Sequence, residues 1–96
     1  MEYKDPEHIK KIIDAIRNEQ KLKKGLLKAR VVKLWKELWG EHINSYTQAV
    51  LFENGKLTVY LTSSTLREEI NRNKNKIIEK MNEELGKKLI KSLILK

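Results

Sequence analysis

A single dipeptide, Asn54-Gly55, places the strongest constraint on what this chain can fold into. It follows a segment rich in aromatic and β-branched residues, Ser45 to Glu53, and precedes the alternating segment Lys56 to Leu61. Asn-Gly between two such segments is typical of a two-residue β-hairpin turn, because both turn positions require a positive φ. The pattern predicts two antiparallel strands, the second of which buries one face: Leu57, Val59 and Leu61.

Before the hairpin, the apolar residues follow a helical period. A first helix is predicted from Pro6, with Asp5 as N-cap, to about Gln20. Its apolar stripe consists of Ile9, Ile12, Ile13 and Ile16. Gly25 permits a break, and a second helix is predicted from about Leu26 to Trp39, with Gly40 as a left-handed C-cap. The stripe of this second helix consists of Leu27, Val31, Leu34, Trp35 and Leu38.

After the hairpin, Thr65 and Glu68 have the spacing of a capping box and predict the start of a third helix that ends at Gly86. Its apolar stripe consists of Leu66, Ile70, Ile77, Met81 and Leu85. The apolar segment from Leu89 to Leu95 predicts a third strand. The expected fold is a compact α+β domain in the order α-α-β-β-α-β, a three-stranded sheet with helices packed on one face.

The composition limits the class of protein. A chain of 96 residues fits one domain, 1–96, of which residues 1–5 are expected to be loosely ordered. The absence of cysteine excludes disulfides and thiolate metal sites. The N-terminus lacks the apolar core of a signal peptide, and no apolar run approaches the ~20 residues that span a bilayer. We therefore expect a cytoplasmic protein that does not enter a membrane.

Positive charge is concentrated between Arg17 and Lys36. This segment holds eight Lys or Arg residues and one acid, Glu19, which gives it +7 of the chain's net charge of +8. Such a density attracts polyanions and is typical of nucleic-acid-binding surfaces. The candidate phosphate-binding residues are Arg17, Lys21, Lys23, Lys24, Lys28, Arg30, Lys33 and Lys36.

Two further basic groups are candidates for the same surface. The first contains Arg67, Arg72, Lys74 and Lys76, and the second contains Lys87, Lys88, Lys91 and Lys96. Among the aromatic residues, Trp35 is expected in the core. The candidates for contact with a base or a partner protein are Trp39, Tyr60, Arg67 and Arg72, although core packing for Trp39 and a plain strand position for Tyr60 are the favoured explanations of those two.

The residues do not indicate an enzyme. Ser63, Ser64 and Thr65 are explained by helix capping, because no glycine elbow or adjacent base accompanies them. No Walker-type glycine loop indicates nucleotide turnover. His8 and His42 lie in separate elements without a carboxylate spacing that would suggest a metal site. We expect no cofactor, no metal and no small-molecule substrate.

Several short motifs resemble those of the DciA family. They are Trp39-Gly40, the run from Asn54 to Val59, Ser63-Ser64 with Glu69-Ile70, and Met81-Asn82 with Leu85-Gly86. The resemblance covers about residues 9–95. It implies a KH-like domain in a bacterial protein of DNA replication that binds DNA, single-stranded DNA in particular, and contacts the replicative helicase as a loader.

The resemblance leaves the nucleic-acid contact to be located. The chain lacks the Gly-x-x-Gly loop with which KH domains clamp a nucleic-acid backbone, so binding is expected on another surface. Two alternative functions remain open from the sequence. One is an RNA-binding adaptor, and the other is a protein-interaction domain whose basic face meets an acidic partner without any role for nucleic acid.

Overall fold

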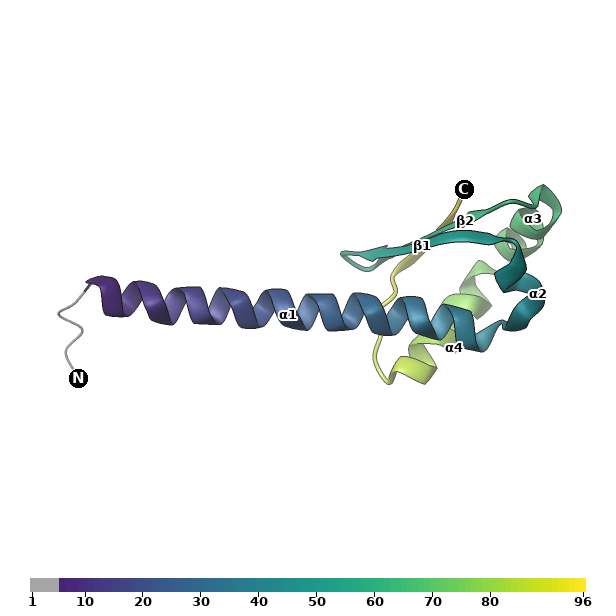
Figure 1. Ribbon diagram of the computed structural model, residues 1–96. Helices are drawn as coiled ribbons and strands as arrows, with labels where there is room; N and C mark the ends of the chain where they lie inside the picture. Colours follow the sequence, from purple (N-terminus) through teal and green to yellow (C-terminus); the bar gives the residue numbers. More distant parts are fainter. Residues whose placement is uncertain (1–5) are drawn as a thin grey trace.

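The computed structural model describes residues 6–96 and shows a small α+β fold with one long projecting helix (Figure 1). The expected N-cap Asp5 and the expected loose order of residues 1–5 lie outside the described residues. The order is α-α-β-β-α-α-β, which confirms the fold class. The elements are α1 (Pro6–Leu38), α2 (Gly40–Ser45), β1 (Thr47–Glu53), β2 (Lys56–Leu61), α3 (Ser64–Arg72), α4 (Lys74–Leu85) and β3 (Ser92–Leu95).

The predicted hairpin is confirmed. Strands β1 and β2 pair antiparallel, with Glu53 opposite Lys56, and the turn residues Asn54 and Gly55 have φ values of 49° and 80°. Positive φ at both positions is what a type I′ turn requires. Strand β3 adds to the other edge of β2 in parallel, with Leu57 opposite Leu93, so the sheet order is β1-β2-β3.

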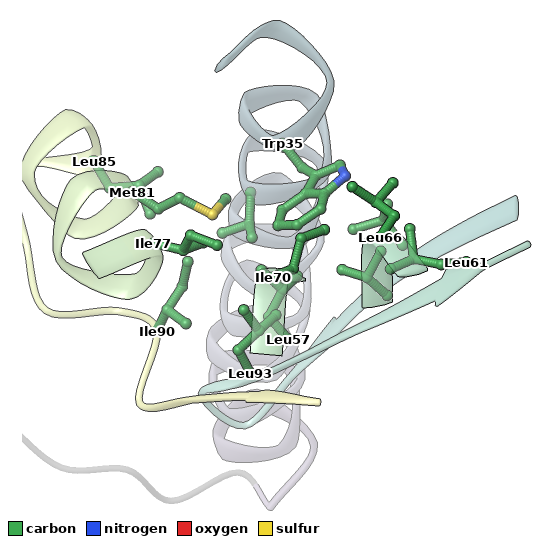
Figure 2. Packing of buried hydrophobic residues seen from close by; sticks show 13 residues of the cluster. Trp35, Leu57, Leu61, Leu66, Ile70, Ile77, Met81, Leu85, Ile90 and Leu93 are labelled. Carbon is green, nitrogen blue, oxygen red and sulfur yellow. The ribbon is translucent and has the colours of Figure 1, made fainter. Parts of the chain in front are cut away.

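The core lies on one face of this sheet. Leu57, Val59 and Leu61 are buried as predicted, and Val50 and Leu93 join them from the neighbouring strands. Helices α1, α3 and α4 contact the strands and supply the rest of the cluster. Figure 2 shows the Trp35 ring entering it from α1, with Met81 and Ile77 of α4 on one side. The predicted stripe of the third helical segment is confirmed, since all its members are buried: Leu66, Ile70, Ile77, Met81 and Leu85.

The predicted break at Gly25 is wrong, and so is the division of residues 6–38 into two helices. Helix α1 runs for 33 residues without interruption. A glycine inside a helix costs only about 1 kcal/mol relative to alanine, and its neighbours here are strong helix formers such as Lys, Leu and Ala. The cost is therefore too small to end the helix, and the residues after Gly25 are further held by packing.

Only the C-terminal part of α1 packs against the sheet. Val31 and Trp35 are fully buried, whereas every described side chain from Glu7 to Leu26 is exposed. The radius of gyration is 18.3 Å and the extents are 63 × 23 × 19 Å, while a compact chain of this length is expected at about 12–13 Å. The molecule is thus less compact than the sequence suggested, because the first half of α1 projects beyond the sheet (Figure 1).

The third predicted helix is two helices, α3 and α4, which meet at Asn73. The Asn73 side-chain Nδ2 donates to the Glu69 carbonyl at 2.9 Å, and its φ of −111° and ψ of 17° lie outside the helical region. An asparagine that bonds to nearby backbone competes with the helical ladder. The start of α3 also differs from the prediction, because Ser63, not Thr65, is the N-cap and accepts a hydrogen bond from the Leu66 N–H.

The segment between α4 and β3 is held by two anchors. Gly86 ends α4 with a φ of 76°, as expected, and β3 begins at Ser92, later than the predicted Leu89. The Asn82 amide clamps the segment by donating to the Ile90 carbonyl at 2.9 Å and accepting from the Ile90 N–H at 2.8 Å. The Lys91 N–H then donates to the Gly55 carbonyl at 2.8 Å. The segment is therefore fixed against the hairpin turn.

The junction between α1 and the sheet contains one element that the sequence pattern did not reveal. Gly40 takes a positive φ of 78°, as expected for a cap, but it is also the first residue of a six-residue helix, α2. The Thr47 hydroxyl donates to the Ile43 carbonyl at 2.9 Å, which connects the end of α2 to the start of β1. β1 consequently begins at Thr47 instead of Ser45.

Replacing Gly25 with Ala should stabilise the helix in the projecting half of α1. Nothing lies within 4 Å of the Cβ that the substitution adds, so the change gains about 0.5–1 kcal/mol of helix propensity without a clash. We expect higher helicity by circular dichroism and slower amide exchange between residues 7 and 24. Lower helicity would contradict a continuous α1.

Replacing Trp35 with Ala should lower the free energy of unfolding by about 3–5 kcal/mol, because the ring is fully buried in the cluster. The indole Nε1 has no hydrogen-bond partner among the described residues, so the loss comes from packing. Urea denaturation measures the change, and Trp35→Phe serves as the control with a smaller loss. Unchanged stability of Trp35→Ala would show that the ring is not part of the core.

Candidate nucleic-acid interface

Four of the eight predicted cations line up on one face of α1. Arg17, Lys21, Lys24 and Lys28 are spaced by four, three and four residues, which places them on one side of a helix over about 17 Å. All four side chains are exposed. We call this set the basic stripe. It adjoins the face that carries Leu27, Val31 and Trp35, and its last two members, Lys24 and Lys28, lie on the side of α1 that faces the hairpin.

The other four cations are dispersed. Lys23 pairs with Glu19 at 3.5 Å and Lys33 pairs with Glu37 at 3.7 Å, each within the helix. The Arg30 Nη2 donates to the Leu85 carbonyl of α4 at 3.3 Å. Lys36 lies near the far end of α1, beside a hollow next to β1. The structure therefore does not bring the eight predicted residues onto one surface.

A second arrangement of cations surrounds a hollow of about 310 Å³ beside the hairpin turn. Lys24 and Lys28 approach it from α1, and Lys88 and Lys91 approach it from the segment between α4 and β3. Its apolar lining comes from three partly buried side chains: Leu27, Phe52 and Leu89. We call this feature the hairpin hollow. It joins two basic groups that are some sixty residues apart in the sequence.

One acid moderates the charge of the hairpin hollow. Glu53 lies at the end of β1, and its Oε1 is 3.5 Å from the Lys28 Nζ. Their side chains are 73% and 48% exposed, so the pair contributes little to stability. Lys91 is better fixed, since its aliphatic stem lies against Gly55, where an added Cβ would stand 3.2 Å from the Lys91 Cδ.

The remaining predicted contact residues lie elsewhere. Trp39 is partly buried against the core, with its ring centre 5.9 Å from that of Trp35 in an edge-on arrangement. Tyr60 lies on the sheet face opposite the core, with the Lys96 ammonium 6.0 Å from its ring centre. Arg67 donates to the Leu61 carbonyl at 2.9 Å, and Arg72 is exposed at the end of α3. These four residues do not form one site with the basic stripe.

The projecting half of α1 carries an exposed apolar stripe on the turns that precede the basic stripe. Ile9, Ile12, Ile13 and Ile16 are between 39% and 51% exposed. The segment from residue 6 to residue 20 contains three acids and three cations, so it is electrically neutral overall, in contrast to the strongly basic residues that follow. The sequence showed this stripe but gave no sign that it would lie outside the core.

Two structural features are absent from residues 6–96. No group of His, Asp and Glu side chains there is arranged to hold a metal ion. No helix of this part of the chain has the length and apolar character needed to cross a membrane. The sequence analysis did not assign four residues of the hairpin hollow to a site, because such residues join a site only through the neighbours that the fold brings to them: Leu27, Phe52, Glu53 and Leu89.

The fold and the site define a class: a small basic α+β module that presents cations from a long helix and from a loop beside a hairpin. The chain matches the family described as "Dna[CI] antecedent, DciA" over residues 8–95 and belongs to that family. Membership implies a role of the helicase-loader type in DNA replication. Comparison with curated proteins and with solved structures finds no match.

Proposed function

We propose that this protein is a non-enzymatic DNA-binding member of the DciA family that helps place the replicative helicase on single-stranded DNA. The observation that carries the DNA-binding half is the basic stripe, in which Arg17, Lys21, Lys24 and Lys28 share one exposed face of α1. Cations on flexible stems suit phosphates and read little sequence, so the stripe binds backbone without strong sequence preference.

The helicase half of the proposal is supported by family membership and by the exposed apolar stripe. A loader has to hold DNA and helicase at the same time, which requires two separate surfaces. The stripe of Ile9, Ile12, Ile13 and Ile16 is apolar, exposed and set in a neutral segment. It resembles the apolar face with which an amphipathic helix enters a partner's groove. We assign the helicase contact to the isoleucine stripe and the DNA contact to the basic stripe that follows it along α1.

Removing the basic stripe should weaken DNA binding and its salt dependence together. For the unchanged protein, neutralisation of about five phosphates of single-stranded DNA gives a slope near −3.5 for log K against log salt. The variant with Arg17, Lys21, Lys24 and Lys28 all changed to Gln should reduce the magnitude of that slope by about 2–3. Fluorescence anisotropy of labelled single-stranded DNA across a salt series measures both quantities.

A matched variant controls for net charge. Changing Lys11, Lys23, Lys33 and Lys80 to Gln removes the same charge from exposed positions outside the stripe, three of them paired with acids within their own helices. It should bind nearly as the unchanged protein does. Equal losses in the two variants would mean that net charge, not the stripe, drives binding. The absence of binding at low salt would leave a protein-interaction domain, and a strong preference for RNA would favour the adaptor.

Changing Ile9, Ile13 and Ile16 to Gln should weaken helicase binding while leaving DNA binding unchanged. These side chains are exposed and distant from the buried cluster, so the free energy of unfolding should change by less than about 0.5 kcal/mol. Binding of the purified replicative helicase, measured by biolayer interferometry, provides the readout. Leu22 and Leu26, also exposed on α1, changed to Gln provide the control. Unaltered helicase binding by the isoleucine variant would place that contact elsewhere.

A further inference from the structure

The hairpin hollow combines an apolar lining with surrounding positive charge. Its lining contains the apolar side chains Leu27, Phe52 and Leu89, while lysines from two separate segments stand around it. Its volume of about 310 Å³ is at the lower end of the range of small-ligand pockets. A hollow of this size can hold one flat ring system with its attached sugar.

We propose that the hairpin hollow is a nucleotide site that takes one unpaired base of a nucleic-acid strand against Phe52, Leu27 and Leu89, while the surrounding lysines hold the adjoining phosphates. This inference rests on the proposed function, because it names the place where the bound strand is fixed. The flat face of the base packs against the aromatic and aliphatic lining, and the phosphates on either side of the base pair with the lysines.

The charge of the hairpin hollow fits this ligand. Lys24, Lys28, Lys88 and Lys91 face a single acid, Glu53, so the site has a clear excess of positive charge. A strand that leaves the end of the basic stripe at Lys28 would meet the lysines of the second segment directly. Because Lys24 and Lys28 belong to both features, the basic stripe leads the backbone into the hollow.

The position of the lysines is built into the fold. The Asn82 amide holds Ile90 through two hydrogen bonds, and the Gly55 carbonyl accepts from the N–H groups of Lys91 and Ser92 at 2.8 and 3.2 Å. Gly55 also leaves room for the Lys91 stem. The segment that carries Lys88 and Lys91 is therefore fixed before any ligand binds, which lowers the entropic cost of binding.

The inference also predicts a preference for unpaired strands. In a duplex the bases are stacked inside and only phosphates face the protein, so a base would have to be flipped out at a cost of a few kcal/mol. A single strand offers bases that are already free. The basic stripe by itself binds phosphates of either form, whereas the hairpin hollow distinguishes the two.

The test compares an oligothymidylate with an oligonucleotide of equal length that carries abasic units, so that the phosphates are the same and only the bases differ. The unchanged full-length chain should bind the oligothymidylate about tenfold more tightly in an anisotropy titration. Phe52→Leu, which keeps an apolar side chain but removes the flat ring, should reduce that preference to about twofold or less. Circular dichroism checks that this variant is folded.

A second variant tests the phosphate contacts without touching the core. Lys88→Gln combined with Lys91→Gln changes two exposed side chains outside the basic stripe, and it should weaken both oligonucleotides by the same factor of about five to tenfold. Lys33→Gln with Lys80→Gln is the matched control and should have little effect. Glu53→Gln should strengthen both, because it removes the acid and releases Lys28.

The outcomes separate this inference from the proposed function. Equal affinity of the unchanged protein for both oligonucleotides would overturn the base site while leaving DNA binding by the basic stripe in place. A base preference that survives in Phe52→Leu together with normal binding by the Lys88 and Lys91 variant would also overturn it, since the base would then lie elsewhere. No binding of either oligonucleotide at low salt would remove the proposed function itself.

Discussion

The burial of Val31 and Trp35 against one face of the sheet is the interaction on which the rest of the structure depends. Both side chains are fully buried, and they attach α1 to the strands and to α4. A two-stranded hairpin is marginal alone, and a third strand and covering helices are needed to bury its apolar face. Since only the C-terminal part of α1 supplies this contact, the first half of the helix projects beyond the sheet and leaves the isoleucine stripe exposed.

The same attachment brings the basic residues together. It lays α1 alongside the hairpin, so that Lys24 and Lys28 reach the Asn54-Gly55 turn, to which the Lys91 segment is hydrogen-bonded. Residues 9–16, which carry the isoleucine stripe, lie away from this region at the N-terminal end of α1 (Figure 1). The proposed function needs two separated surfaces, one for DNA and one for the helicase, and a partly attached helix offers two with few residues.

The sequence predicted those parts of the fold that depend on local chemistry. The Asn-Gly turn, the buried face of β2 and the caps at Gly40 and Gly86 follow from φ requirements and side-chain alternation, which act within a few residues. Prediction from the sequence failed where the free-energy cost of a local feature is small. Gly25 did not break α1, because about 1 kcal/mol is not decisive. The division at Asn73 was missed because Ile70 and Ile77 keep the same helical phase across it.

By itself, the sequence determined the class of fold, the buried faces of β2 and of the third helical segment, and the existence of a dense basic segment. Only the tertiary structure decided which lysines line the hairpin hollow, because cations some sixty residues apart meet through the packing of α1 and the anchoring of the Ile90 segment by Asn82. It likewise decided that the isoleucine stripe lies exposed while the equivalent stripe around Val31 is buried. Periodicity shows that a helix has an apolar face, but burial depends on whether another element lies within reach of it.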